Sequence, residues 1–168
     1  YNPNQLFGKQ LRGAGYVRAS NLFIQGNLLM DFDKRTYDYE KVREEVLTVL
    51  EFLKTKPQYE VQYLQFSGTS GIHLYGTDKE PFTNPDPFKR MEEYKTRRAS
   101  LMQDLKQWLT ERKIELVTLD NNNVTTNPYQ VFKPTKTIDM KSGRQVTHIP
   151  IHTLKSKTMK EILSTIPT

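Results

Sequence analysis

The sequence predicts an α+β domain built from mostly antiparallel or mixed sheets flanked by helices. Three short apolar runs have the length of strands, and two longer stretches repeat apolar residues every three or four positions, as amphipathic helices do. Clusters of turn-forming residues separate neighbouring apolar runs, which favours antiparallel hairpins. With 168 residues the chain is expected to form one domain over 1–168, with residues 1–15 as an N-terminal arm.

The first half is expected to hold strands and one helix in the order β, β, α, β, β. Gly26 and Asn27 form the turn of the first hairpin, and Asp38 is placed to cap the helix. One stripe of that helix is apolar, and Lys56-Pro57 ends it. The expected strands are 22–24, 28–33, 61–66 and 72–75, and the expected helix is 39–54 with the stripe Val42, Val46, Val49, Leu50 and Leu53.

The second half is expected to open with a proline-containing loop over 76–87 and a long helix over 87–112. The residues expected on the buried side of that helix are Phe88, Met91, Leu101, Met102, Leu105, Trp108 and Leu109. Its basic run, Lys95 with Arg97 and Arg98, is expected to be a solvated face. Three further strands follow, and Ser156 is expected to cap a C-terminal helix within 152–168. These strands are 114–119, 129–132 and 144–151, the last two flanking a basic loop over 133–141.

Composition points to an acidic partner and excludes several kinds of site. The chain has 25 basic and 19 acidic residues, a net charge of +6, and a pI near 9.4, which favours nucleic acid as a partner. It contains no cysteine, so disulfides, thiolate zinc sites and cysteine nucleophiles are excluded. No run reaches the ~20 apolar residues of a membrane span, and no signal-like segment opens the chain. We therefore expect a cytoplasmic or nucleoid-associated protein that is not secreted and does not bind a membrane.

Two acids follow the apolar run at the end of the second expected strand. Asp31 and Asp33 are two residues apart, so they share one face of a strand while Phe32 points into the core. Paired carboxylates repel each other unless a cation lies between them, and Mg²⁺ prefers such oxygen-rich sites. With Asp120, at the end of another expected strand, they could hold two divalent ions for in-line displacement at phosphorus. The alternative is a strand that runs into an acidic turn.

A glycine-rich turn lies between the strands 61–66 and 72–75. Ser67, Gly68, Thr69 and Ser70 offer backbone N–H groups and hydroxyls that suit a phosphate, and His73 can donate a hydrogen bond to an anionic oxygen. No Gly-Lys-Ser/Thr follows, so this is not a Walker loop. The alternative is a glycine-rich hairpin with an incidental histidine.

Taken in order, these motifs resemble the archaeo-eukaryotic primase superfamily, and most of all its small (catalytic) subunit. The resemblance rests on Leu-Leu-Met-Asp31-Phe-Asp33, on Phe-Ser67-Gly-Thr-Ser-Gly-Ile-His73-Leu, and on Leu-Asp120, with the helix between the first two in the expected place. It continues through Val-Thr-Thr at 124–126, the Lys-Ser-Gly turn at 141–143 and Ile-Pro-Ile at 149–151, so it covers about residues 15–151.

This resemblance implies a primase core that makes or extends an RNA or DNA primer on a single-stranded DNA template. Asp31, Asp33 and Asp120 would bind two Mg²⁺ or Mn²⁺ ions, and Ser67, His73, Lys133 and Lys141 would contact the nucleoside triphosphate. Arg18 and Arg144 are expected to contact nucleic acid. The family's zinc module is absent, because the chain has no cysteine, so this would be a minimal version without zinc. A primase large subunit or a fused accessory domain is a further partner that the resemblance suggests.

Four positions depart from the family pattern. Ser70 stands where an arginine is expected, and Asn127 and Gln130 stand where the family often has Asp followed by Arg or His. Asp139 falls near an expected histidine. These changes remove positive charge near the nucleotide. Two alternatives therefore stay open: a repair polymerase like the polymerase domain of bacterial ligase D, and a primase-fold nucleic-acid-binding module whose nucleotide site has decayed.

Overall fold

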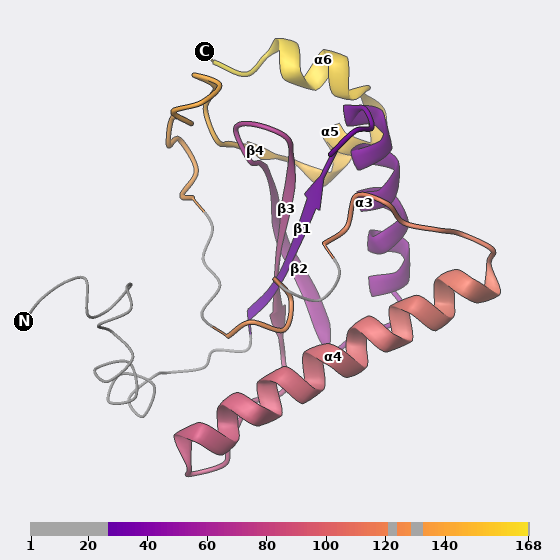
Figure 1. Cartoon of the computed structure of the whole chain (residues 1–168), viewed down its shortest axis with the longest axis vertical. Helices are drawn as coiled ribbons and strands as arrows, with labels where there is room; N and C mark the ends of the chain where they lie inside the picture. Colours follow the sequence, from indigo (N-terminus) through magenta and orange to yellow (C-terminus); the bar gives the residue numbers. More distant parts are fainter. Residues whose placement is uncertain (1–26, 121–123, 129–132, 168) are drawn as a thin grey trace, which may run out of the picture.

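The computed structural model describes residues 27–120, 124–128 and 133–167. The expected arm, the strands 22–24 and 129–132, Arg18 and Gln130 lie outside these residues. Helices and strands interleave as the α+β class requires (Figure 1). In chain order they are β1 (Asn27–Asp33), α3 (Tyr39–Leu53), β2 (Tyr59–Phe66), β3 (Gly71–Asp78), α4 (Pro87–Glu111), β4 (Thr147–Ile149), α5 (Ile151–Ser156) and α6 (Met159–Ser164).

The four strands form one sheet in the order β1-β3-β2-β4, and every pairing is antiparallel. Strand β3 lies between β1 and β2, although α3 connects β1 directly to β2, so β1, α3 and β2 form a split βαβ arrangement. The hairpin expected between β2 and β3 is confirmed. A single bridge between Phe32 and Leu119 adds the end of the expected strand 114–119 to the other edge of β1.

One face of the sheet forms the hydrophobic core with the helices. Alternation along β1 buries Leu28, Met30 and Phe32 completely, as the two-residue period of a strand requires. The predicted stripe of α3 belongs to the same core cluster, as do Leu101, Met102, Leu105 and Leu109 of α4 and Met159 and Ile162 of α6. The opposite face of the sheet carries Asp31, Gln65 and His73, whereas Asp78 at the end of β3 is buried against α4.

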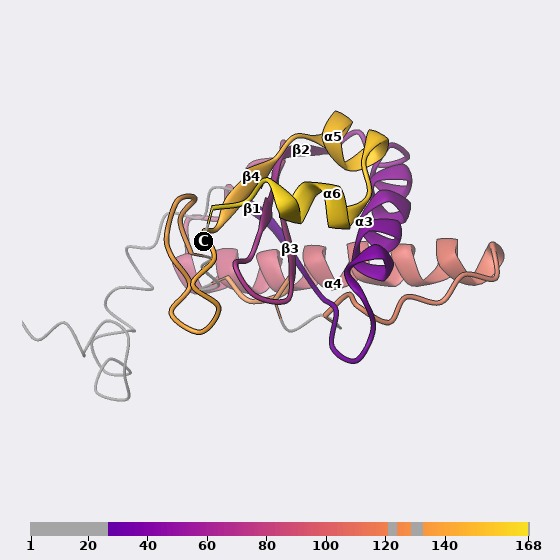
Figure 2. The same cartoon turned by 90° about the horizontal axis from the view of Figure 1, so that it is seen from above.

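Helix boundaries follow local capping chemistry. The Asp38 Oδ1 atom accepts a hydrogen bond from the Lys41 N–H at 2.9 Å, which confirms it as the cap of α3. Asp86 caps α4 in the same way, and Pro87 occupies the first turn, where a missing N–H costs nothing. In Figures 1 and 2, α3 stands beside the sheet, whereas α4 runs across the end of the sheet where β1 begins. The polar end of β1 therefore lies away from α4.

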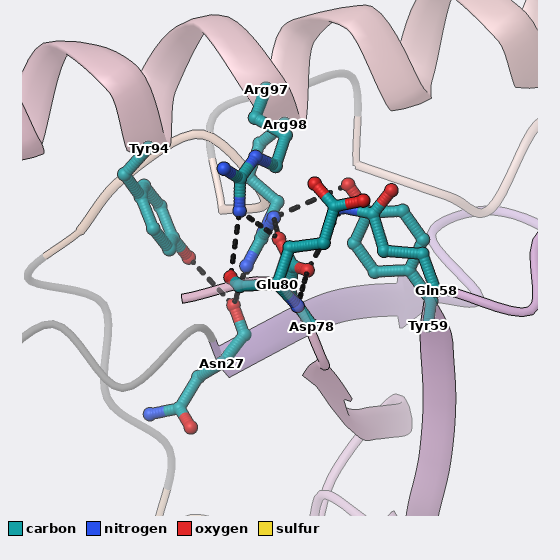
Figure 3. A network of polar contacts seen from close by, with 8 residues as sticks. All are labelled: Asn27, Gln58, Tyr59, Asp78, Glu80, Tyr94, Arg97 and Arg98. Atoms are coloured by element: carbon teal, nitrogen blue, oxygen red, sulfur yellow. Dashed lines mark hydrogen bonds and ion pairs between the residues drawn. The ribbon is translucent and has the colours of Figure 1, made fainter. Parts of the chain in front are cut away.

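The expectation of a solvated basic face on α4 is wrong for Arg98, which is completely buried. Its guanidinium lies 2.9 Å from the Asp78 carboxylate at the end of β3 and donates to the Asn27 carbonyl at 2.8 Å. Figure 3 shows Tyr94 and Arg97 converging on the same cluster. Burial acts to raise the pKa of Asp78, but hydrogen bonds from Arg97, Gln58 and Arg98 outweigh it and lower that pKa. The buried ion pair of Arg98 and Asp78 therefore links α4 to the end of β3.

Three other expectations are corrected by the structure. The strand expected over 144–151 is shorter, because only Thr147–Ile149 pairs with β2 and Pro150 precedes α5. The single C-terminal helix is two short helices, and Thr158 rather than Ser156 caps the second. Phe88 of α4 is 44% exposed, because it lies in the first turn of α4, away from the buried stripe.

Candidate active site

Asp31, His73 and Gln65 form a row across three neighbouring strands. Asp31 pairs with His73 in the register of β1 and β3, and Gln65 pairs with His73 in that of β2 and β3. The His73 Nε2 atom lies 3.4 Å from the Asp31 Oδ1 atom. Its Nδ1 atom lies 3.2 Å from the Gln65 side-chain nitrogen. The sheet register therefore joins residues that are far apart in the sequence.

The surroundings of this row shift the pKa values of both titratable groups. Burial raises the pKa of Asp31 to about 6, and the negative charges of Asp33 and Asp120 add to the shift, while Arg35 opposes it. Burial lowers the pKa of His73 to about 4, and the positive charge of Lys133 adds to that shift. At pH 7 the imidazole is therefore neutral and the carboxylate is ionised.

The hydrogen bonds of Gln65 indicate which nitrogen of the neutral His73 imidazole carries the proton. The Gln65 side-chain nitrogen donates to the Lys133 carbonyl at 3.0 Å, and its side-chain oxygen accepts from the Thr135 hydroxyl at 3.1 Å. This orientation turns the amide N–H toward His73 Nδ1, which must then be the acceptor. The proton is left on Nε2, the atom that faces Asp31. The row is thus an amide hydrogen-bonded to an imidazole, whose other nitrogen faces a carboxylate oxygen 3.4 Å away.

Asp33 and Asp120 join Asp31 at the end of β1. The Asp120 N–H donates to the Asp31 carbonyl at 2.9 Å, and the Asp33 N–H donates to the Thr118 carbonyl at 2.8 Å. The Asp33 Oδ1 atom accepts from the Arg35 N–H at 2.8 Å. Three aspartates from two chain segments are therefore neighbours at the end of β1. The sequence predicts this proximity if the two segments end side by side.

The arrangement and the charge of Asp31, Asp33 and Asp120 indicate whether these residues suit a divalent cation. As their side chains lie, the described residues hold no set of three or more His, Cys, Asp or Glu side chains arranged around one point. However, Asp31 experiences two further carboxylates and only one opposing arginine. Carboxylate oxygens are the ligands that Mg²⁺ prefers, and a bound cation would favour the ionised form of each carboxylate that its neighbours otherwise disfavour. The chemistry of the three aspartates thus suits the cation, whereas their side chains do not converge on one point in this structure.

The turn after β2 is built around the Ser67 hydroxyl. Its oxygen accepts from the N–H groups of Thr69, Ser70 and Gly71 at 3.4, 3.3 and 3.0 Å. The converging donors expected for a phosphate are therefore present, and they are engaged by Ser67 itself. On the outside of the turn, the Ser70 carbonyl accepts from the Lys34 N–H at 2.8 Å, so the residue after Asp33 lies directly against the turn.

Close approach explains both glycines of this turn. A Cβ atom on Gly71 would lie 1.6 Å from the Phe32 carbonyl oxygen, because Gly71 pairs closely with Asp33 at the end of β1. Gly68 has φ +92°, and a Cβ atom there would lie 2.9 Å from that of Asp139. The glycines thus permit contact with β1 on one side and with the basic loop on the other.

The basic loop packs on the turn through Asp139 and Ser142. Asp139 is 3% exposed and accepts from the N–H groups of Lys141 and Ser142, and it forms an ion pair with Lys133. Ser142 Oγ donates to the Gly68 carbonyl. Lys133 is therefore held by Asp139, whereas Lys141 is exposed. The ion pair with Lys133 lowers the pKa of Asp139 to about 2.

The predicted site residues that the structure describes fall into one connected region. Asp31, Asp33, Asp120 and His73 meet on the sheet, and the turn 67–71 and the loop 139–144 adjoin them. Sequence reasoning missed Gln65 and Glu45, which hold His73 and the segment before Asp120. A polar residue at position 65 inside an apolar strand is a signal for Gln65, but its partner depends on the strand register.

Comparison with known proteins identifies no relative of this chain. No protein-family model, curated protein or solved structure matches it. In the part of the chain that the structure describes, no helix combines the length and the apolar character that crossing a membrane requires.

Proposed function

We propose that this chain is a primase or primase-polymerase catalytic domain, which transfers nucleotides to a primer on a single-stranded DNA template. The 3′-hydroxyl of the primer would attack the α-phosphorus of a nucleoside triphosphate. A new P–O bond forms, the bond to the β,γ-diphosphate breaks, pyrophosphate leaves with the electron pair, and the hydroxyl proton passes to solvent. The product is an RNA or DNA primer longer by one nucleotide.

The observation that carries this proposal is the row of Asp31 and His73 beside Asp33 and Asp120. Carboxylates that raise one another's pKa values tend to occur at functional sites, because uncompensated negative charge lowers stability. The resemblance of the same residues, in the same order, to primase motifs gives this charge cluster a specific chemistry.

Each group of the site has a role that its chemistry supports. Asp31, Asp33 and Asp120 would hold two Mg²⁺ or Mn²⁺ ions, which supply charge neutralisation at the phosphates when bound. His73, neutral with its proton on Nε2, can donate a hydrogen bond to a phosphate oxygen without adding charge. In the adjoining turn of Ser67, Gly68, Thr69 and Ser70, the hydroxyl groups of Thr69 and Ser70 would be the further donors, because Ser67 Oγ holds the converging N–H groups. Catalysis by these residues would be mainly positioning and electrostatic stabilisation.

The template is expected to bind through its phosphates. Lys141 and Arg144 lie on the loop that packs against the turn, and neither pairs with a carboxylate among the described side chains. Binding through such cations releases counterions, so affinity for single-stranded DNA should fall steeply as salt rises. A flat salt response would count against a basic binding surface.

The second candidate is a nucleic-acid-binding module whose nucleotide site has decayed. Two contacts favour it: Ser67 occupies the donors of its own turn, and Lys133 is held by Asp139. The ligase D type of repair polymerase, the other alternative that the resemblance leaves open, would use the same aspartates.

Calorimetric titration separates the first two candidates. The full chain is titrated with a nucleoside triphosphate in the presence and the absence of Mn²⁺, alongside the Asp31→Asn variant. The proposed function predicts binding that requires Mn²⁺ and is lost in Asp31→Asn. A decayed module predicts no metal-dependent affinity, while salt-sensitive binding of single-stranded DNA persists.

A further inference from the structure

The buried carboxylate of Glu45 has no part in the proposed reaction. It lies on α3 among Val42, Val46 and Val49, and only 3% of its side chain is exposed. Its nearest cation is Lys41, whose Nζ atom lies 4.0 Å away. A buried carboxylate is costly unless other groups hydrogen-bond its oxygens. The groups that hydrogen-bond the Glu45 carboxylate therefore indicate its role in the fold.

The hydrogen-bond donors to Glu45 come from two consecutive residues, Val117 and Thr118. The Oε1 atom accepts from the Val117 N–H at 2.9 Å, from the Thr118 N–H at 2.8 Å and from the Thr118 hydroxyl at 2.9 Å. The Oε2 atom also accepts from the Val117 N–H, at 3.0 Å. Because charge-assisted bonds are the strong ones, this carboxylate is a firm anchor for the segment 117–120.

The anchored segment is the one that carries Asp120 to the end of β1. The Thr118 carbonyl accepts from the Asp33 N–H, and the Asp120 N–H donates to the Asp31 carbonyl. Between them, Leu119 bridges Phe32. Outside that bridge, residues 114–120 belong to neither a helix nor a strand, so their position depends on these hydrogen bonds and on the packing of Leu116 and Leu119 against the core. Glu45 thus holds one side of the segment while β1 holds the other.

We infer that Glu45 is a positioning residue, which fixes the segment 117–120 against β1 and so sets the place of Asp120 beside Asp31 and Asp33. This inference rests on the proposed function, since the place of Asp120 matters to the reaction only if the three aspartates bind cations together. Glu45 itself contacts neither the substrate nor the reacting atoms.

The test compares Glu45→Gln with Glu44→Gln in the full chain. Glutamine keeps the size of the side chain, but it removes the charge and turns an NH₂ group toward N–H donors. Glu44 is the exposed neighbour on the same helix and serves as the matched control. Thr118→Val, which removes only the hydroxyl donor, is a milder second variant should Glu45→Gln fold poorly.

Two quantities are measured under conditions where circular dichroism shows each variant folded. Mass-resolved hydrogen exchange reports protection of the amides of residues 117–120. Electron paramagnetic resonance of free Mn²⁺ reports the dissociation constant for the metal without any nucleotide. We expect Glu45→Gln to exchange these amides at least ten-fold faster and to raise the Mn²⁺ dissociation constant about ten-fold. Thr118→Val should shift both in the same direction by about three-fold, and Glu44→Gln should change neither.

Each contrary outcome has a definite meaning. If the amides of Glu45→Gln exchange faster but its Mn²⁺ affinity is unchanged, Glu45 is a purely structural anchor and the inference is overturned. If the amides of Glu45→Gln exchange at the same rate as those of the unaltered chain, Glu45 does not hold the segment, and the inference is overturned as well. If the unaltered chain binds Mn²⁺ no better than Asp31→Asn does, the proposed function fails and the inference falls with it. Normal Mn²⁺ binding by both the unaltered chain and Glu45→Gln would overturn the inference alone.

Discussion

The Asp31 Oδ1 atom lies 3.4 Å from the His73 Nε2 atom, and this contact is not an ion pair at neutral pH. Burial and neighbouring carboxylates raise the pKa of the aspartate to about 6, and burial lowers that of the histidine to about 4. His73 therefore remains neutral and cannot balance the negative charge of Asp31. We propose that a bound cation supplies the balancing charge.

Replacing Asp31 by Asn should stabilise the folded chain at pH 7.5. A raised pKa means that the ionised carboxylate is less favourable in the folded than in the unfolded chain, and removing it relieves about 1–3 kcal/mol. Urea unfolding measures this difference. Mn²⁺ should raise the stability of the unaltered chain and leave Asp31→Asn unchanged.

The control for this measurement is Glu115→Gln, since Glu115 is exposed. We expect its stability and its response to Mn²⁺ to match those of the unaltered chain. Destabilisation by Asp31→Asn at pH 7.5 would show that the carboxylate is structurally satisfied, which would contradict the unbalanced charge proposed for Asp31.

The pH dependence of stability should separate His73 from Asp31. Between pH 6.5 and 4 the unfolded chain takes up a proton at residue 73 while the folded chain does not, so the contribution of His73 to stability falls as pH falls. Asp31 acts in the opposite direction between about pH 6 and 3.8, because the folded chain takes up its proton first.

Relative to the unaltered chain, His73→Gln should therefore gain stability as pH is lowered from 6.5 to 4, whereas Asp31→Asn should lose it. Each slope should be on the order of 1 kcal/mol per pH unit. Urea unfolding at several pH values measures both. Relative slopes of the same sign in the two variants would contradict the two pKa directions.

A methyl group on Gly71 should separate β3 from the end of β1. The added Cβ atom would lie 1.6 Å from the Phe32 carbonyl, an overlap that backbone movement must relieve, so Gly71→Ala should cost more than about 3 kcal/mol. Gly143→Ala is the matched control: φ there is +70° and no atom lies within 4 Å, so it should cost about 1 kcal/mol. Equal costs in urea unfolding would contradict the close approach of the two strands.

Replacing Asp78 by Asn should leave Arg98 buried without a counter-charge. Removal of one partner of a buried ion pair typically costs about 3–5 kcal/mol. Arg97→Gln serves as the comparison, because Arg97 is a quarter exposed, and it should cost about 1 kcal/mol or less. Guanidinium chloride unfolding would contradict the role of this cluster if the two variants lost the same stability.

Features of this fold that depend on local chemistry could be predicted from the sequence. Asp38 marks the start of α3, Pro87 that of α4, and the spacing of Asp31 and Asp33 fixes the face they share. Features that depend on distant partners could not. In the sequence, Arg98 belongs to a basic run that is typical of a solvated helix face. Its burial becomes evident only from the fold, which brings Asp78, 20 residues earlier, beside it.

The same distinction applies to the candidate site. Its aspartates and His73 stand out as residue types at strand ends, whereas Gln65 and Glu45 act through partners that only the register of the sheet and the packing of α3 bring close. Lys133 has a basic side chain in a basic loop, yet it pairs with the buried carboxylate of Asp139. The two short C-terminal helices differ from the single predicted helix because the extended backbone at Lys157 ends the first and the Thr158 cap begins the second.

Nucleotide incorporation on a single-stranded template, with Mg²⁺ or Mn²⁺ and a supplied primer, tests whether the aspartates bind cations for nucleotidyl transfer. The full chain is compared with the double variant Asp31→Asn/Asp33→Asn. We predict a metal-dependent extension product that disappears in the double variant. Extension that persists in the double variant, or that proceeds equally without metal, would contradict the assignment of these two carboxylates.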